Sequence, residues 1–101
     1  MAVAKQFNIF VSYAMKKITG LSQFVNVCNS RNLTVAAREL GVSQPSLTQA
    51  IAKLEMQLDV VLFDRSSRPM GLTTYGMMVL DYAQTLEQST DSLTENLAAM
   101  K

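Results

Sequence analysis

The sequence predicts a mainly helical fold: three short helices, a short two-stranded hairpin and a long C-terminal helix. Apolar residues recur at steps of three and four residues in each helical stretch. Gly41 lies between two of these stretches, at a spacing typical of a tight turn. The C-terminal stretch carries a heptad pattern. At 101 residues, the chain is long enough for one small domain.

The composition is globular and argues against catalysis. Apolar residues make up 49% and charged residues 17% of the chain. There is no histidine and one cysteine, Cys28, so the usual zinc sites and Ser-His or Cys-His nucleophile pairs are absent. The four glycines lie too far apart to form a phosphate loop. We therefore expect no enzyme, no metal and no cofactor.

The sequence also indicates where the protein acts. No apolar run approaches the roughly 20 residues that span a bilayer, and the N-terminus lacks a secretory cleavage pattern. A single cysteine fits a reducing compartment. We expect a cytoplasmic, nucleoid-associated protein with no membrane partner.

The first helix is predicted over residues 18–29. Ile18, Leu21, Phe24, Val25 and Cys28 follow helical spacing, and Cys28 is expected to be a buried small side chain. Apolar residues continue the same spacing through residues 3–14, so an earlier start of this helix is an alternative.

A helix-turn-helix pattern follows. Thr34 is expected to cap a second helix over residues 35–40, and Gly41 to end it. Ser43 can then cap a third helix whose first turn contains Pro45. Two helices joined by a turn of about three residues define this motif.

The third helix, to Leu58, separates two faces. Its apolar stripe consists of Leu47, Ile51, Leu54 and Leu58. Its opposite face is small and uncharged apart from Lys53, which suits close approach to another surface. This outward face consists of Pro45, Thr48, Gln49, Ala52 and Lys53.

A hairpin and a long helix complete the chain. Apolar runs at residues 60–63 and 70–72 flank a basic, polar tip at 64–69. The last helix runs from Thr74 to about Met100, with Thr73 or Thr74 as its cap, over ~39 Å at ~1.5 Å per residue. So small a domain would leave much of its stripe uncovered, which predicts a homodimer through this helix. The predicted dimerisation residues are Val79, Ala83, Leu86, Thr90, Leu93 and Leu97.

Residues 33–76, LTVAARELGVSQPSLTQAIAKLEMQLDVVLFDRSSRPMGLTTYG, resemble the N-terminal domain of LysR-type regulators. In that family a segment like AAxxLxxSQPxLSxxIxxLExxLGxxLFxR precedes a wing and an LTxxG start of a linker helix. The resemblance extends over about residues 16–100. It implies a winged helix-turn-helix at 16–72, a linker helix at 73–101 that pairs antiparallel with its copy, and an N-terminal extension at 1–15.

The resemblance implies a bacterial transcription regulator that binds double-stranded DNA sequence-specifically, with residues 43–58 in the major groove and the tip 64–69 in the minor groove. Gln44 and Gln49 present the donor and acceptor that can pair with the N6/N7 edge of adenine. The net charge is only +1, but positive charge is biased away from the acidic last helix. The candidate DNA-binding residues are Arg31, Thr34, Arg38, Ser43, Gln44, Pro45, Ser46, Thr48, Gln49, Lys53, Arg65 and Arg68.

Simpler interpretations remain open for several of these residues. Ser43 is a helix cap whether or not it touches DNA, and Gln49 is a solvated side chain in the alternative. Arg65 can pair with Asp64 or Glu55 instead of DNA. The alternative function is a protein-interaction module that forms mixed dimers with a full-length family member.

The chain departs from the family pattern in four ways. Asp59 stands where a glycine usually ends the third helix, and Gln49 where many members have arginine. Family members continue as a sensor domain about twice this length, so we expect a fragment of a longer regulator. Because the family ordinarily starts near Met15, residues 1–14 are expected to be an added segment or extra helical turns.

Overall fold

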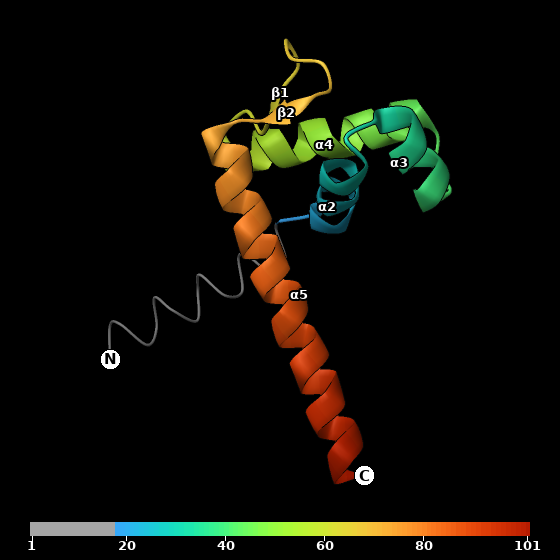
Figure 1. Ribbon diagram of the computed structural model, residues 1–101, viewed down its shortest axis with the longest axis vertical. Helices are drawn as coiled ribbons and strands as arrows, with labels where there is room; N and C mark the ends of the chain where they lie inside the picture. The colour runs from blue at the N-terminus through green and yellow to red at the C-terminus, as the bar shows by residue number, and fades with distance from the viewer. Residues whose placement is uncertain (1–17) are drawn as a thin grey trace.

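The computed structural model describes residues 18–101, and it confirms the predicted mainly helical class. The expectations for residues 1–14, and for an earlier start of the first helix, lie outside the described residues. In chain order the elements are α2 (Leu21–Ser30), α3 (Leu33–Leu40), α4 (Gln44–Leu58), β1 (Phe63–Asp64), β2 (Gly71–Leu72) and α5 (Thr74–Met100) (Figure 1).

The predicted start of the first helix at Ile18 is wrong. Gly20, at φ 87°, lies in the left-handed region, so α2 begins only at Leu21. The helix ends at Arg31, which is also left-handed at φ 55° and whose N–H donates to the Val27 carbonyl. A left-handed conformation at a residue with a Cβ costs about 1–2 kcal/mol, which the surrounding packing must offset.

The predicted cap of the second helix is also wrong. Asn32, not Thr34, precedes α3 in an extended conformation, and its Oδ1 accepts from the Val35 N–H at 3.1 Å. Thr34 already lies in the helix, so its side chain cannot serve as the N-cap. Asn and Thr are both good capping residues, so their residue types alone do not decide between the two positions.

The ends of α4 confirm the predicted signals. The Ser43 hydroxyl accepts from the Ser46 N–H at 3.2 Å, and Pro45 lies in the first turn. Gly41 closes α3 at φ 70°. Asp59 closes α4 at φ 57°, and its N–H reaches the carbonyls of Glu55 and Met56, so an aspartate occupies a position that favours glycine.

The core lies where α2 meets the other helices. α2 contacts α3, α4 and α5, and the stripe of α4 closes over it. The rings of Phe24 and Phe63 lie 5.3 Å apart, which joins α2 to the wing. Each fully buried large apolar side chain stabilises the fold by about 1.5–3 kcal/mol. The fully buried side chains are Phe24, Val27, Leu47, Ile51, Leu54 and Leu62.

The wing is shorter than predicted. β1 and β2 pair antiparallel with Phe63 opposite Leu72 and Asp64 opposite Gly71. Residues 60–62 do not join the strand, because the Leu62 N–H donates to a Glu55 carboxylate oxygen at 2.7 Å instead of to a neighbouring strand. The predicted tip at residues 64–69 thus includes the last residue of β1.

α5 begins against the wing and then leaves the domain. Thr73 caps it by accepting from the Gly76 N–H at 3.0 Å, and Gly76 and Ala83 are its buried residues. Beyond Ala83 the residues are exposed, and the helix projects away from the rest of the fold (Figure 1). Among residues 18–101, no helix has the length and apolar character needed to cross a membrane.

Gly76 is predicted to be essential for seating α5. A Cβ at this position would lie 2.2 Å from the Leu62 carbonyl oxygen and 2.9 Å from a Leu72 methyl, so the Gly76→Ala variant must displace backbone. We expect a loss of at least about 1–3 kcal/mol in the free energy of unfolding, measured by urea denaturation.

The matched control is Gly71→Ala, whose Cβ would meet only the Ser67 hydroxyl, at 3.2 Å. Equal stability of the Gly76→Ala variant and the wild type would contradict the close approach of α5 to Leu62.

Candidate DNA-binding surface

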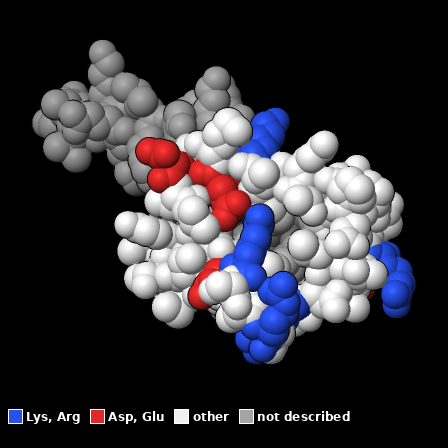
Figure 2. Space-filling view, turned by 90° about the horizontal axis from the view of Figure 1, so that it is seen from above, with Lys and Arg blue, Asp and Glu red and all other residues white. Residues whose placement is uncertain are grey.

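The outward face of α4 is open to solvent along its length. All five residues predicted for that face are exposed, while Leu47, Ile51 and Leu54 on the other side are buried. Figure 2 looks down on the end of the molecule that carries the wing, where most of the surface is neutral, with separate basic groups near its middle and at its edges and the acidic groups toward the left. The outward face of α4 carries no charge apart from Lys53.

The first turn of α4 holds two of its polar side chains in place. The Ser43 hydroxyl, besides capping the helix, donates to the Ser46 hydroxyl at 2.8 Å. The Oε1 of Gln44 accepts from the hydroxyl of Thr34 on α3 at 3.0 Å. Both glutamines are exposed, and Gln49 lies one turn and a half further along the helix. The N-terminal part of α4 is therefore partly organised before any ligand arrives.

The two wing arginines are already engaged within the chain. Arg65 pairs with Glu55 at 3.6 Å, one of the two acids offered by the sequence, and half of its side chain stays exposed. Arg68 donates to the carbonyls of Arg65 and Ser67 at 2.8 and 3.2 Å. Both residues remain exposed, but Arg65 is paired with a residue of α4 and Arg68 is bonded to the backbone of the wing.

The turn of the wing is organised by Asp64. Its carboxylate accepts from the N–H and the hydroxyl of Ser66 at 3.0 and 2.5 Å. These hydrogen bonds, the hydroxyl's first, lower the pKa of Asp64 from its ordinary value. Asp64 therefore shapes the tip of the wing and is not the partner of Arg65. The peptide bond between Arg68 and Pro69 is cis.

Three further basic residues surround this surface. Arg31, Arg38 and Lys53 are exposed, and among residues 18–101 they form no ion pair. They come from three different elements: Arg31 closes α2, Arg38 lies in α3 and Lys53 lies on the outward face of α4. Their charges are free to meet an anionic partner.

The structure identifies Glu55 as a residue whose role the sequence did not reveal. One of its carboxylate oxygens accepts from the Leu62 N–H at 2.7 Å, and the other faces Arg65. Its side chain is only 17% exposed. Glu55 thus ties the recognition helix to the wing, a bond between residues seven apart that no local pattern encodes.

A second surface lies along α5 and against α2. Of the predicted dimerisation residues, Val79 and Ala83 pack within the chain, which removes them from the open stripe. Leu86, Leu93 and Leu97 are exposed, and so is Thr90, whose hydroxyl donates to the Leu86 carbonyl at 3.0 Å.

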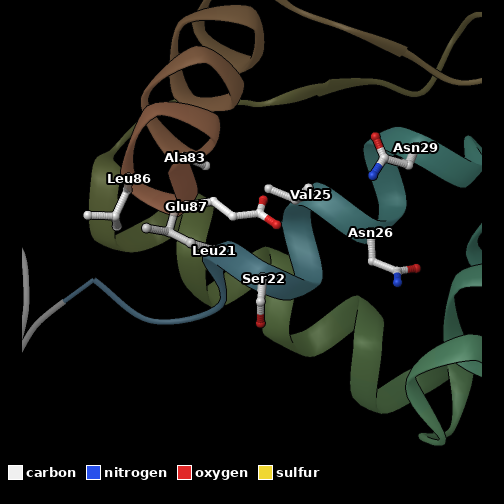
Figure 3. Close-up of a pocket in the computed structure, with 8 residues that line it drawn as sticks. All are labelled: Leu21, Ser22, Val25, Asn26, Asn29, Ala83, Leu86 and Glu87. Carbon is white, nitrogen blue, oxygen red and sulfur yellow. The ribbon is translucent and has the colours of Figure 1, made fainter. Parts of the chain in front are cut away.

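An apolar groove lies where α2 and α5 meet (Figure 3). It has a volume of about 460 Å³, and Leu21 and Val25 from α2 and Ala83 and Leu86 from α5 form its apolar lining. Glu87 extends from α5 toward α2 at its edge (Figure 3). The groove is continuous with the exposed stripe through Leu86, which belongs to both.

The cysteine thiol and the acidic side chains of the described residues form no further reactive site. Burial raises the pKa of the half-buried Cys28 thiol to about 11, which keeps it protonated at neutral pH. Within residues 18–101, no group of three or more Cys, Asp or Glu side chains is arranged to hold a metal ion.

Taken together, these features define a class: a helix-turn-helix domain with a short wing, an exposed recognition helix and a long projecting helix. The model of the family described as "Bacterial regulatory helix-turn-helix protein, lysR family" matches residues 18–77. The chain belongs to this family.

Relatives and solved structures agree with this assignment. A probable hydrogen peroxide-inducible genes activator of Mycobacterium avium is 42% identical over 77 residues, which are 76% of this chain and 25% of the relative. The HTH-type transcriptional regulator ClcR of Pseudomonas putida is 41% identical over 71 residues, 70% of this chain and 24% of the relative. The chain thus spans about a quarter of these curated relatives.

The fold matches solved structures closely. A complex of BenM DBD with benA site 1 DNA superposes with a TM-score of 0.77 at 30% identity, over 84% of this chain and 99% of that one. Full-length BenM gives a TM-score of 0.71 at 33% identity, over 78% of this chain and 26% of that one.

The role of Glu55 leads to a prediction about stability. Glu55→Ala leaves the buried Leu62 N–H without an acceptor and is expected to cost about 1–3 kcal/mol in the free energy of unfolding. Glu55→Gln keeps an acceptor oxygen and should lose less. Urea denaturation measures both.

The control is Arg65→Ala, which removes only the half-exposed ion pair and should change stability by no more than about 1 kcal/mol. If Arg65→Ala costs as much as Glu55→Ala, the ion pair and not the hydrogen bond to Leu62 is the stabilising contact.

Proposed function

We propose that this chain binds double-stranded DNA sequence-specifically as a dimeric transcription regulator, with α4 in the major groove and the wing at the adjacent minor groove. The observation that carries the proposal is the outward face of α4, which is exposed, uncharged apart from Lys53 and free of cover by other described residues. A neutral face can approach base edges, while flanking cations meet phosphates. The likeness to BenM DBD, whose solved structure is a complex with benA site 1 DNA, supports the proposal.

The contacts divide into two kinds. Gln44, Gln49 and Thr48 are proposed to meet base edges, and Pro45 and Ala52 to offer apolar contact to a thymine methyl. Ser43 and Ser46 border the same surface. Arg31, Arg38 and Lys53 are proposed to hold the phosphates, and the backbone at Thr34 offers a further phosphate contact.

The wing is proposed to contribute positive charge beside the DNA more than to insert an arginine into the minor groove. Arg65 and Arg68 keep exposed guanidinium groups, but their intrachain bonds limit their reach. Because Glu55 neutralises Arg65, that arginine must exchange partners to insert into a minor groove. We propose that its contribution to affinity is smaller than that of Lys53.

The proposed dimer follows from the exposed surface of α5. One recognition helix reads only a few base pairs, so useful selectivity requires two. Leu86, Leu93 and Leu97 leave a large apolar stripe in water on an otherwise polar helix, which a second copy of α5 would cover. The groove between α2 and α5 offers the end of that second helix a place to pack.

Because bacterial DNA lies in the cytoplasm, we propose that the protein acts there, and that its role is binding rather than catalysis.

The proposal is tested by selection of duplexes from a randomised 30-base-pair library with the purified 101-residue chain. We expect enrichment of a two-part motif with half-sites about one helical turn apart. Recovery of duplexes without any shared motif would overturn sequence-specific binding, and failure of the purified chain to retain any duplex would favour the alternative of mixed dimers with a longer regulator.

Base reading and phosphate contact are separable by substitution. Gln49→Ala is expected to lose about 1–3 kcal/mol of binding free energy on the selected duplex, through relaxed preference at one base position. Lys53→Ala should weaken binding to all duplexes alike and should reduce the number of counterions released on binding by about one. Fluorescence anisotropy at several salt concentrations measures both. Equal losses across all sequences for Gln49→Ala would show that Gln49 touches only the backbone.

The dimer is tested on the exposed stripe of α5. Leu86→Asp places a charge in the apolar interface, so we expect a folded monomer by sedimentation velocity and weakened DNA binding. Gln88→Asp introduces the same residue on the opposite side of the helix and should leave the dimer intact. An unchanged sedimentation coefficient for Leu86→Asp would remove this stripe from the interface.

A further inference from the structure

The polar contact between the two helices of the motif involves a residue of the reading surface. Thr34, in the first turn of α3, donates its hydroxyl to Oε1 of Gln44, the first residue of α4, at 3.0 Å. Among residues 18–101, Nε2 of Gln44 forms no hydrogen bond. The amide is therefore held at its oxygen and free at its nitrogen.

Nothing else in the fold accounts for Thr34. Asn32 caps α3 in its place, and the Thr34 side chain is exposed, so it fills no part of the core. Both partners of this hydrogen bond lie at the surface, where such a bond adds little to stability. Its effect is instead on Gln44, a long side chain that would otherwise sample many rotamers.

We propose that Thr34 is a specificity-determining residue that acts through Gln44. By holding Oε1 on the side of α3, Thr34 presents the two N–H donors of the Gln44 amide to the major groove. A donor group reads acceptors, and every purine carries one at N7, to which guanine adds O6. The sequence alone left Gln44 as a donor and an acceptor suited to adenine, whereas the held oxygen makes Gln44 a donor that reads a purine N7. Thr34 is a positioning residue here, because it acts on the base through Gln44.

This inference rests on the proposed function, since it requires α4 to lie in the major groove. The experiment uses the duplex selected by the wild-type chain. Each purine in turn is replaced by its 7-deaza analogue, which removes the N7 acceptor and keeps Watson–Crick pairing. We expect one position at which the analogue weakens wild-type binding about tenfold and leaves Gln44→Ala unaffected.

Thr34→Val removes the hydroxyl and keeps the shape of the side chain. The Thr34→Val variant should lose most of the tenfold effect of the 7-deaza analogue at that position, while its melting temperature stays unchanged. Thr34→Ser retains the hydroxyl and should restore the wild-type pattern. Thr85→Val, an exposed substitution on α5, controls for a general effect of replacing threonine by valine.

Three outcomes would overturn the inference. A Thr34→Val variant with the full wild-type response to the analogue would show that Gln44 needs no positioning. Weaker binding to all duplexes, with the full response to the analogue retained, would show that the Thr34 side chain touches a phosphate and does not position Gln44. An effect of Thr34→Val that persists in the Gln44→Ala background would show that it acts by another route. If the wild-type chain selects no motif, both the proposed function and this inference fail. If it selects a motif but one of the three outcomes above is observed, only the role of Thr34 is removed.

Discussion

The backbone of Leu62 is the point on which the arrangement of the DNA-binding elements depends. Its N–H is held by Glu55 of α4, and its carbonyl accepts from the N–H of Thr73 at 3.0 Å. The same carbonyl lies where a side chain on Gly76 would be, and the Leu62 side chain is fully buried. The backbone of one residue therefore helps to fix α4, the wing and α5 relative to one another. A dimer that spaces two half-sites requires this rigidity, because any freedom between α4 and α5 would change the distance between the two reading heads.

Glu55 also explains why the charge around the reading surface is distributed as it is. Placed under the wing, its carboxylate neutralises Arg65 and binds Leu62, so it serves structure at the expense of one free cation. Among the described residues Arg65 has an acidic partner, whereas Arg31, Arg38 and Lys53 on the helices, and Arg68 in the wing, form no ion pair. A surface with a net charge near zero can thus present local positive charge to phosphates. In the proposed function, selectivity rests on neutral groups such as Gln44 and Gln49, whose hydrogen bonds depend on position more than on salt.

The sequence predicted the elements whose signals are local. Ser43 and Pro45 mark the start of α4, Gly41 the end of α3, and the spacing of its leucines the buried side of α4. Signals that compete were misassigned, since Asn32 and Thr34 are both capping residues and only tertiary context chooses between them. The bond from Glu55 to Leu62 and the contact from Thr34 to Gln44 could not be predicted, because each joins residues on different elements. The outward face of α4 was predictable because it follows directly from the buried one.

The single apolar stripe of α5 serves two purposes that divide at Ala83. Before it, Val79 and Leu80 pack on the core of their own chain, and after it Leu86, Leu93 and Leu97 lie in water. One heptad pattern in the sequence therefore continues from core contacts into an exposed stripe, and periodicity alone could not tell where the core contacts end. If the proposed dimer forms, substitutions of the exposed leucines after Ala83 act on association without removing a core residue. The groove beside Leu86 lies at this boundary, where the surface of one domain continues directly into the surface that a second copy would cover.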